Sequence, residues 1–157
     1  YAEAMYYQIA AASGQHPATA KSAREAEQQL VNRLGLDASR YKFVDGSGLS
    51  LYNYVSAELE VRLLRYAYSN QFILNHLLPA LPVAGVDGTL KMRMCSAFTR
   101  SNVRAKTGTV MGVSSLCGYL TASNGHQICF SIINQGVMHG RNGRSFQDRV
   151  CSILCRP

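Results

Sequence analysis

No stretch of about 18 residues in this sequence is apolar throughout, because charged residues, Pro and Gly interrupt every hydrophobic segment, and a membrane-spanning helix is therefore excluded. CxxC pairs and Cys/His clusters with the spacing of zinc ligands are also absent, so we expect no metal site. The Cys residues are odd in number and form no disulfide framework: Cys95, Cys117, Cys129, Cys151 and Cys155. We expect no more than one or two disulfide bridges among them, and we expect them to pack as small hydrophobic side chains.

Lysine is scarce, and Arg carries most of the excess positive charge. The sequence has 16 Lys and Arg against 9 Asp and Glu, a formal net charge of +7, but its only lysines are Lys21, Lys42, Lys91 and Lys106. Such a charge suits an anionic partner. The basic residues are scattered along the chain without a run of five or an RNA-binding motif, so we expect no nucleic-acid binding. Anionic polymers of the cell envelope fit the same charge.

Sequence signatures of several enzyme classes are missing. The chain has no Walker loop, and the glycines at 46 and 48 lack the third glycine of the dinucleotide fingerprint. The hydrolase elbow G-x-S-x-G would need Gly in place of Asp45. The histidines are dispersed and stand in no metalloprotease context: His16, His76, His126 and His139. We expect them to be surface or packing residues.

The first half of the chain is predicted to be helical. We expect helices over residues 2–12, 19–34, 56–69 and 72–78. In the first, Met5 and Ile9 share one face, and in the second the spacing Ser22-x-x-Glu25 is that of a capping box. Ser56 is expected to cap the third helix. Between the second and third helices, the glycines in 45–48 predict a structured loop.

The second half is predicted to be an antiparallel sheet followed by a helix. We expect strands over residues 103–110, 114–122 and 126–134 and a last helix around 145–154. Asn-Gly at 124–125 is a strong hairpin signal, and a two-residue turn there would pair Leu120 with Cys129 and Tyr119 with Phe130. Both faces of the sheet would then be apolar and need cover. The sequence thus predicts one α+β domain over residues 1–157, an antiparallel sheet covered by helices.

The triplet Lys106-Thr107-Gly108 lies on a predicted strand beside a hairpin, where its backbone could face a ligand. Two other blocks precede it in the chain. The three blocks are VDGSGLSLYN at 44–53, LPVAGVDGTL at 81–90 and AKTGT at 105–109. In order and spacing they resemble the class C penicillin-binding proteins, which are serine D-alanyl-D-alanine carboxypeptidases and endopeptidases of the bacterial envelope. The resemblance runs from the first helix to about Gln135.

The resemblance implies the C-terminal part of a penicillin-binding/serine β-lactamase-like transpeptidase domain, without metal or cofactor. It implies that Lys106 is catalytic and that Thr107, Gly108 and Thr109 bind substrate. The Lys106 ammonium and the Thr107 hydroxyl would hold the terminal carboxylate of a D-alanyl peptide. Gly108 would let the substrate lie close to the strand edge, and the N–H of Thr109 would be an oxyanion-hole donor. The implied ligands are peptidoglycan stem peptides ending in D-Ala-D-Ala and β-lactam antibiotics, and the implied location is the periplasm or cell envelope.

Members of that family also use S-x-x-K, which carries the nucleophile and its base, and S-x-N. One S-x-x-K occurs, at 39–42, but it leads straight into the Asp45 loop and no S-x-N lies between it and Lys106. We interpret it as a chance match, with the true nucleophile upstream of a C-terminal fragment. Two alternatives stay open: a non-catalytic peptidoglycan-binding module of the same fold, and an exposed strand-edge role for Lys106 that only discourages aggregation.

Overall fold

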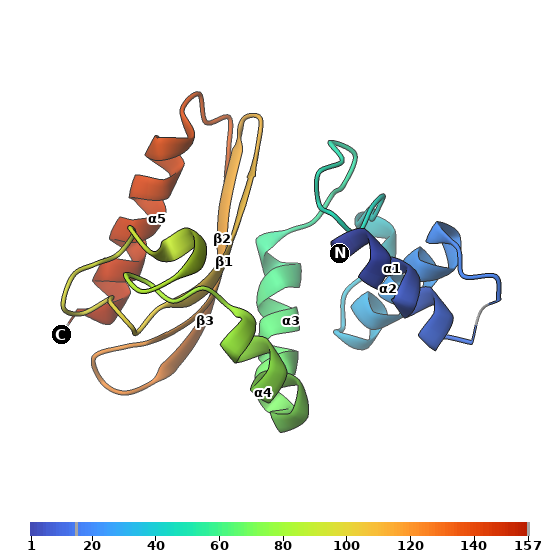
Figure 1. Cartoon of the computed structure of the whole chain (residues 1–157), viewed down its shortest axis with the longest axis horizontal. Coiled ribbons are helices and arrows are strands. Elements are labelled where there is room, and N and C mark those ends of the chain that lie inside the picture. Colours follow the sequence, from blue (N-terminus) through green and yellow to red (C-terminus); the bar gives the residue numbers. More distant parts are fainter. Residues whose placement is uncertain (15, 157) are drawn as a thin grey trace. The chain divides into compact units, whose positions relative to one another are not determined.

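The chain forms two compact units, Tyr1–Leu59 and Glu60–Pro157. The computed structural model describes residues 1–14 and 16–156. Each unit has its own buried apolar clusters, and helix α3 (Ala57–Ser69) begins in the first unit and lies mostly in the second (Figure 1). The prediction of a single domain over residues 1–157 stays a prediction, because it concerns how these units are joined.

The first unit contains the predicted helices α1 (Ala2–Ala12) and α2 (Ala20–Arg33), followed by a short 3-10 turn at Ala38–Arg40. Helix α1 packs through a different face from the one that carries Met5 and Ile9. Met5 and Ile9 are exposed, and Tyr6 and Ala10 are buried against Ala23 of α2. The small side chains of Ala10 and Ala23 let the two helices pack closely, so the buried face of α1 is rotated by about one residue.

The capping box of α2 begins three residues earlier than predicted, at Thr19. Thr19 is the N-cap: its hydroxyl accepts from the Ser22 N–H at 3.1 Å, while the Ser22 hydroxyl accepts from the Thr19 N–H at 3.0 Å. Ser22 is therefore the third helical residue of the capping box and not its first. The predicted role of Glu25 falls away, and Glu25 lies 3.9 Å from Lys21 as an exposed ion pair.

The predicted loop at 45–48 is organised by the carboxylate of Asp45. That carboxylate accepts from the Ser47 hydroxyl at 2.6 Å, the Gly48 N–H at 3.1 Å and the Asn53 amide at 2.6 Å. Asn53 in turn accepts from the Val44 N–H at 2.7 Å. These bonds lower the pKa of Asp45, the hydroxyl of Ser47 being the largest cause. The polar groups of this block thus hold a turn together.

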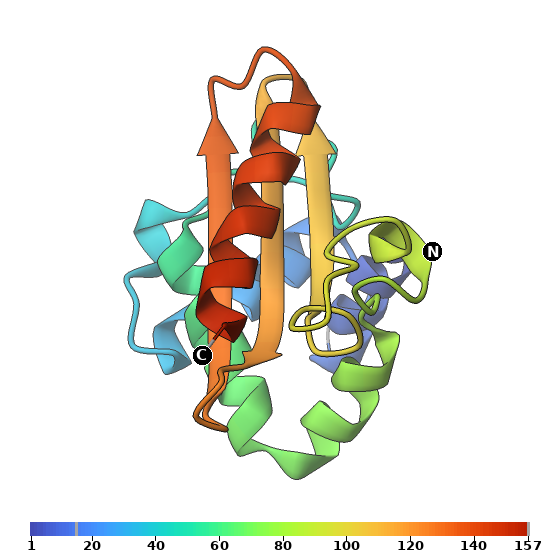
Figure 2. The same cartoon turned by 90° about the vertical axis from the view of Figure 1, so that its left-hand side faces the viewer.

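The second unit is a three-layer α/β/α arrangement. Its elements after α3 are α4 (Gln71–Ala80), a 3-10 turn at Gly88–Leu90, β1 (Arg104–Val110), β2 (Val113–Thr121), β3 (Gln127–Gln135) and α5 (Gly140–Cys155). The strands form an antiparallel sheet in the order β1-β2-β3. Helix α5 runs across one face of this sheet (Figure 2), and α3 and α4 lie on the other (Figure 1). This confirms the predicted α+β class and the need to cover both faces.

Alternate residues of β2 build the two layers of core. Leu116 and Leu120 are buried with Cys151 and Cys155 of α5. On the opposite face Tyr119 is buried with Leu64 and Leu81, and its hydroxyl donates to the Leu64 carbonyl at 2.7 Å. Burial raises the pKa of Tyr119 to about 12, so the phenol remains this donor at any physiological pH.

The predicted pairing of the last hairpin was wrong by one residue. Tyr119 pairs with Cys129, and Leu120 pairs with Ile128. The turn has three residues rather than two: the Ala122 N–H donates to the His126 carbonyl at 2.9 Å, and Gly125 takes a left-handed conformation with φ of 83°. A three-residue loop of this kind ends on a residue in the left-handed region, which Gly adopts without strain.

Helix α5 begins at Gly140, five residues before the predicted start near Ser145. The sequence did not predict this first turn, because Gly140 and Gly143 are poor helix formers. Packing requires Gly143, because a Cβ there would lie 2.8 Å from the Ser114 Cβ on β2. A close approach between helix and sheet thus outweighs the low helix propensity of glycine.

The residues that the structure describes contain no disulfide, no membrane-spanning helix and no cluster of metal ligands. All five Cys are free, and Cys151 and Cys155 are buried in the core, as expected for small hydrophobic side chains. Each helix within residues 1–14 and 16–156 is too short or too polar to traverse a bilayer. Within the same ranges no three His, Cys, Asp or Glu side chains gather as metal ligands.

Glu27 and Tyr6 form a buried polar pair in the first unit. The Tyr6 hydroxyl and the Glu27 Oε2 atom are both shielded from solvent without a standard hydrogen bond among the described residues. Burial raises the pKa of Glu27 to about 7 and that of Tyr6 to about 12. A protonated Glu27 satisfies the site better than a charged one.

The chain should therefore lose stability as the pH rises from about 4.5 to 7, because over this range Glu27 ionises in the unfolded chain while burial keeps it protonated in the folded chain. Glu27→Gln should remove this loss and raise the melting temperature at pH 8 on the order of a few degrees, with little change at pH 5. Thermal unfolding of the two proteins across this pH range is the measurement, and exposed Glu25→Gln is the control. A difference that does not vary with pH would contradict the assignment.

Candidate functional site

The K-T-G triplet lies on β1, the edge strand of the sheet. The outer side of β1 is partly occupied: the Ala105 N–H donates to the Pro82 carbonyl at 3.0 Å, and Val83 forms a bridge to Arg104. Because N–H and C=O groups alternate between the two sides of a strand, those of Thr107 and Thr109 also point outward, away from β2. No strand within the described ranges pairs with them. This leaves a short open edge at Thr107–Thr109.

Lys106 and Thr107 extend from β1 to opposite faces of the sheet. Lys106 pairs across to Cys117 on the α3 face, and Thr107 pairs across to Leu116 on the α5 face. The Lys106 Nζ bends round the edge and donates to the Thr107 carbonyl at 2.7 Å. The Thr107 hydroxyl donates to that of Thr89 at 3.0 Å. The two groups can thus reach one ligand only at the open edge, where each would exchange its present partner.

Gly108 was expected to let a substrate lie close to the strand edge, but the atom nearest to its missing side chain belongs to Ser115 of β2. A Cβ at this position would overlap the Ser115 hydroxyl on the neighbouring strand, and no other residue comes within 4 Å of it. Gly118 on β2, which pairs with Ala105, is more tightly confined, because a Cβ there would overlap the Arg104 carbonyl and lie 2.6 Å from the Ala105 Cα. Gly118 is needed for β1 and β2 to pair, and Gly108 is not.

A cavity of about 420 Å³ opens beside the K-T-G strand on the α5 side. Hydroxyl and guanidinium groups dominate its wall, which is formed by Thr89, Arg93, Thr107, Thr109, Ser114, Ser115 and Arg144. The wall contains no acidic side chain. Donors of this kind suit an anionic or carbonyl-bearing ligand. A separate cavity of about 380 Å³ between α3 and β3 contains no residue of the triplet.

Arg93 is held in this wall by a buried network. Its guanidinium donates to the Asp148 carboxylate at 2.7 Å and to the Gln147 Oε1 atom at 3.0 Å. The Gln147 side chain is fully buried, and its amide donates to Ser114 at 3.1 Å and to Asn134 at 3.0 Å. Ser114 and Arg93, which both line the cavity, are thereby fixed to α5.

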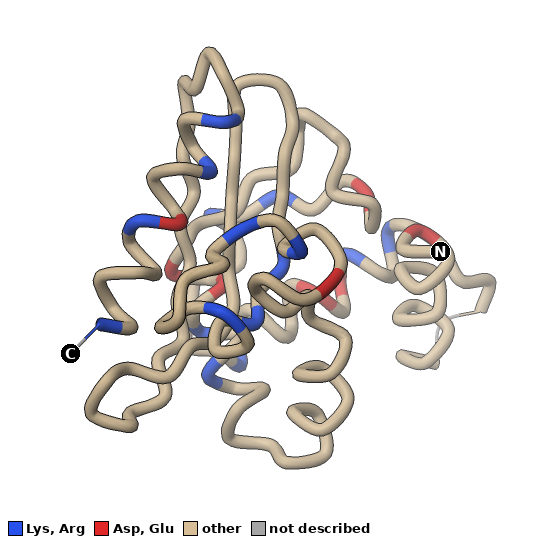
Figure 3. Tube along the Cα trace, turned by 60° about the vertical axis from the view of Figure 1, so that its left-hand side comes forward, with Lys and Arg blue, Asp and Glu red and all other residues tan. Residues whose placement is uncertain are grey.

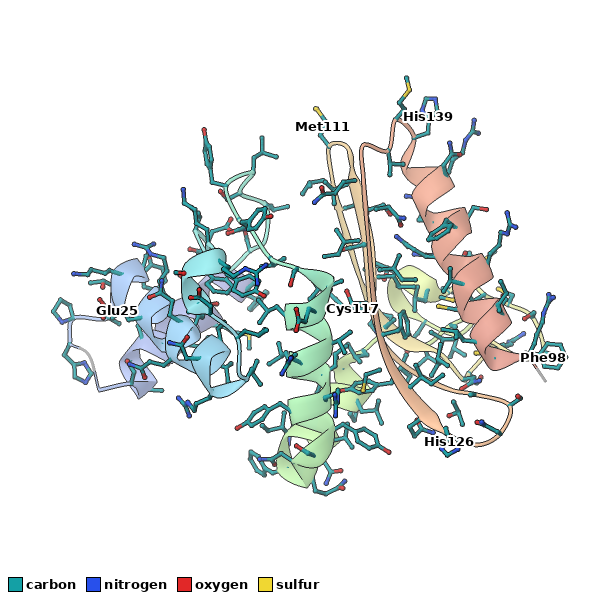
Figure 4. The ribbon with its side chains drawn as sticks, turned by 180° about the vertical axis from the view of Figure 1, so that it is seen from behind. Glu25, Phe98, Met111, Cys117, His126 and His139 are labelled. Atoms are coloured by element: carbon teal, nitrogen blue, oxygen red, sulfur yellow. The ribbon has the colours of Figure 1, made fainter. Side chains whose placement is uncertain are left out.

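The opposite face of the sheet, beside Lys106, has a different character. Glu60 on α3 accepts from the Ser131 hydroxyl at 2.6 Å. Burial, reinforced by the charge of Glu60, raises the pKa of Cys117 to about 12. Cys117 stays a neutral thiol and is no nucleophile. Figure 4 labels Cys117 on the side of the sheet that faces α3.

The S-x-x-K match at 39–42 lies in the first unit and lacks the geometry of a nucleophile with its base. The Ser39 hydroxyl donates to the Asp37 carboxylate at 2.7 Å. The Lys42 Nζ lies 5.6 Å from the centre of the Tyr52 ring. Ser39 is therefore bonded to an acid that caps a 3-10 turn and not to Lys42. This geometry favours the interpretation of a chance match.

Sequence reasoning missed most of the cavity wall. It identified Thr107 and Thr109 but neither Arg93 nor Arg144, which the fold brings to the strand from segments 13 residues before and 38 residues after Lys106. The hydroxyl pair at 114–115 on the next predicted strand was the one available signal. Arg144 was hidden because the first turn of α5 was not predicted.

Comparison with solved structures defines the fold as that of penicillin-binding proteins. The structure of penicillin-binding protein 4 from Haemophilus influenzae in complex with a β-lactam is 28% identical, with a TM-score of 0.84 over 99% of this chain and 38% of that one. The structure of an extended-spectrum β-lactamase, TLA-1, aligns with a TM-score of 0.62 at 15% identity over 82% of this chain and 52% of that one, a likeness of fold alone.

The family follows from the sequence comparisons. Residues 1–156 match the model of the D-Ala-D-Ala carboxypeptidase 3 (S13) family, and the chain belongs to this peptidase family. D-alanyl-D-alanine carboxypeptidase DacB of Haemophilus influenzae is 32% identical over 82% of this chain and 27% of its own length. A D-alanyl-D-alanine carboxypeptidase of an Actinomadura species is 40% identical over 69% of this chain and 21% of its own length. The chain thus spans less than a third of these relatives.

Substitutions at the two strand glycines should differ in what they cost in stability. Gly118→Ala should destabilise the chain by about 1–3 kcal/mol, because the new Cβ meets backbone atoms of β1 that cannot rotate away. Gly108→Ala should cost less, since the Ser115 hydroxyl can turn aside, and Ser115→Ala added to it should remove the remaining cost. Urea unfolding measures both. Equal losses for the two single variants would contradict this description of the edge.

Proposed function

We propose that this chain is the substrate-binding part of a serine-type D-Ala-D-Ala carboxypeptidase or endopeptidase that acts on peptidoglycan stem peptides through an acyl-enzyme. The observation that carries the proposal is the open edge of β1 at the K-T-G triplet, in a chain of the S13 peptidase family. An extended peptide can pair with the outward-facing N–H and C=O groups of Thr107 and Thr109 as an added strand, once the Lys106 ammonium releases the Thr107 carbonyl.

Each site residue then has a role that its position allows. The Thr109 N–H points outward from the edge and would donate to the oxyanion of the tetrahedral intermediate, an interaction of about 3 kcal/mol per donor. Thr107 would turn its hydroxyl from Thr89 to the ligand, and Gly108 keeps the strand surface bare between them. Lys106 would place its ammonium at the reacting end of the peptide, where it assists the serine.

In the acylation step the serine oxygen bonds to the carbonyl carbon of the penultimate D-Ala, and the terminal D-Ala leaves as its amine after taking a proton. Water then hydrolyses the ester and restores the serine. Neither step needs a metal or cofactor. The partners proposed are stem peptides that end in D-Ala-D-Ala and β-lactams, which acylate the same serine. The proposed location is the periplasm or cell envelope.

A non-catalytic peptidoglycan-binding module is the second candidate. It is favoured by the position of Ser39, whose hydroxyl is bonded to Asp37 rather than to a lysine. Such a module would use the open edge of β1 to hold the peptide without forming a covalent bond. The two candidates differ in whether the protein that carries this chain is acylated by penicillin.

The 157-residue chain, taken alone, should neither hydrolyse a D-Ala-D-Ala peptide nor gain the mass of penicillin. An acyl-enzyme needs an activated serine, and removing a nucleophile lowers the rate by several orders of magnitude. Intact-mass spectrometry after exposure to penicillin is the measurement. An adduct that maps to Ser39 would show that the S-x-x-K at 39–42 is functional.

In the longer protein that contains this chain, Lys106→Ala should lower the rate of acylation by labelled penicillin by roughly 100-fold or more, because a positioned charge near the reacting centre is lost. The fold should stay near native, since Lys106 is exposed. Exposed Lys91→Ala is the matched control and should react as the unmodified protein does. Unchanged acylation in Lys106→Ala would refute the assignment of Lys106. No labelling of the correctly folded parent would favour the non-catalytic module.

A further inference from the structure

The side of α5 that points away from the sheet carries two large apolar side chains. Phe146 is 52% exposed and Ile153 is 67% exposed, whereas Gln147 and Cys151 on the sheet side of the helix are fully buried. Phe146 and Ile153 lie seven residues apart, which is about two turns, so they share one side of the helix. Figure 2 shows this side of α5 uncovered by the strands or by α3 and α4. The two side chains therefore contribute little to the core and remain accessible.

Arginines alternate with these apolar side chains. Arg149 lies three residues after Phe146 and four before Ile153, and Arg156 lies three after Ile153, just beyond the end of the helix. This spacing places apolar and cationic side chains in turn along one side of α5. Both arginines are exposed. These four residues, Phe146, Arg149, Ile153 and Arg156, are called the outer face of α5 below.

The arginines along α5 have no acidic partner. Within residues 1–14 and 16–156 no ion pair includes Arg141, Arg144, Arg149 or Arg156. The acidic residues of the second unit are occupied elsewhere. Asp148 is paired with Arg93 at 2.7 Å, and Asp87 accepts from the Val83 N–H at 2.7 Å. Glu60 is bonded on the α3 face of the sheet. The positive charge along α5 is thus left for an external anion to neutralise.

Positive charge is also concentrated in the second unit as a whole. This unit holds 11 of the 16 Lys and Arg but only 3 of the 9 Asp and Glu, and Figure 3 shows basic positions along the whole length of α5. The segment that packs beside α5 through Arg93 and Met94 adds the exposed side chains of Lys91 and Met92. The resulting field attracts an anionic surface. In chain order these residues are scattered, so the sequence did not reveal the concentration.

A bilayer surface with anionic lipid matches the outer face of α5 in both charge and polarity. Guanidinium groups pair with lipid phosphates, whereas Phe and Ile side chains gain free energy by entering the apolar layer just below the headgroups. A hydrated polyanion, such as a nucleic acid or a charged wall polymer, would also pair with the arginines. It would leave Phe146 and Ile153 in water, so it accounts for only half of the pattern.

We propose that the outer face of α5 docks the protein on a bilayer surface that contains anionic lipid. The helix lies in the plane of the surface, and its other side stays packed on the sheet through Gln147 and Cys151. None of the four residues of this face lines the cavity beside the K-T-G strand. The inference goes beyond the proposed peptide site, and each of the two can fail without the other.

The test is co-sedimentation with vesicles of phosphatidylglycerol and phosphatidylcholine in equal parts, and with vesicles of phosphatidylcholine alone. The 157-residue chain and the longer protein that contains it should both bind the mixed vesicles, bind the neutral ones roughly tenfold more weakly or less, and be released by salt. Phe146→Ser with Ile153→Ser should weaken binding to the mixed vesicles by roughly tenfold or more, because two inserting side chains are lost. Arg149→Gln with Arg156→Gln should weaken it by a similar factor.

Matched pairs of substitutions remove the same kinds of group elsewhere. Leu63→Ser with Phe72→Ser removes two exposed apolar side chains from α3 and α4, and Arg33→Gln with Arg65→Gln removes two exposed charges. Both control pairs should bind the mixed vesicles as the unmodified protein does. Circular dichroism checks that each variant is folded, and the single Ile153→Ser variant replaces the Ser pair if that pair does not fold.

Three results would overturn the inference. Equal weakening by the two arginine pairs would show an effect of net charge alone. Unchanged binding after the apolar side chains of α5 are removed would show a contact of the polyanion type. Binding by the 157-residue chain but not by the longer protein would show that the rest of that protein covers the outer face of α5.

Discussion

One buried amide, that of Gln147, joins the helix, the sheet and the segment before it. Its amide nitrogen donates to Ser114 on β2 and Asn134 on β3, and its oxygen accepts from Arg93. The Gln147 side chain is fully buried, where an unmade bond would cost about 1–3 kcal/mol, so α5 has one position on the sheet. Gly143 makes this position possible by letting α5 approach Ser114 closely. The cavity beside the K-T-G strand is therefore a fixed consequence of how α5 docks.

The two faces of the sheet present different chemical groups around β1. The α5 face offers hydroxyls and guanidinium groups without a carboxylate, whereas the α3 face places Lys106 near neutral Cys117 and the carboxylate of Glu60. The alternation of a β-strand makes this division unavoidable, because Lys106 and Thr107 are neighbours in sequence and must face opposite ways. A ligand at the edge is consequently reached from both sides at once: hydroxyls on one side, an ammonium on the other.

Sequence periodicity and turn residues predicted the order and type of the elements, because local preference and packing agree there. They failed where contacts between distant residues decide. Asn-Gly at 124–125 fits a two-residue or a three-residue loop, and the two differ by one residue in pairing. Gly143 argues against a helix until Ser114 is seen beside it. The K-T-G triplet was found since its residues are adjacent, but Arg93 and Arg144 meet it only in the folded unit.

The bond between the Ala105 N–H and the Pro82 carbonyl also limits how long the open edge can be. Pairing on the outer side of β1 stops there, and the strand itself ends at Val110, so only Thr107 and Thr109 present outward backbone groups that no strand occupies. An exposed strand is a template for other strands, and natural proteins guard against this by keeping such edges short. Two residues are enough to hold a short peptide in one register and too few to start a sheet with another copy of the chain. The segment around Pro82 thus limits the part of β1 that another strand could pair with to these two residues.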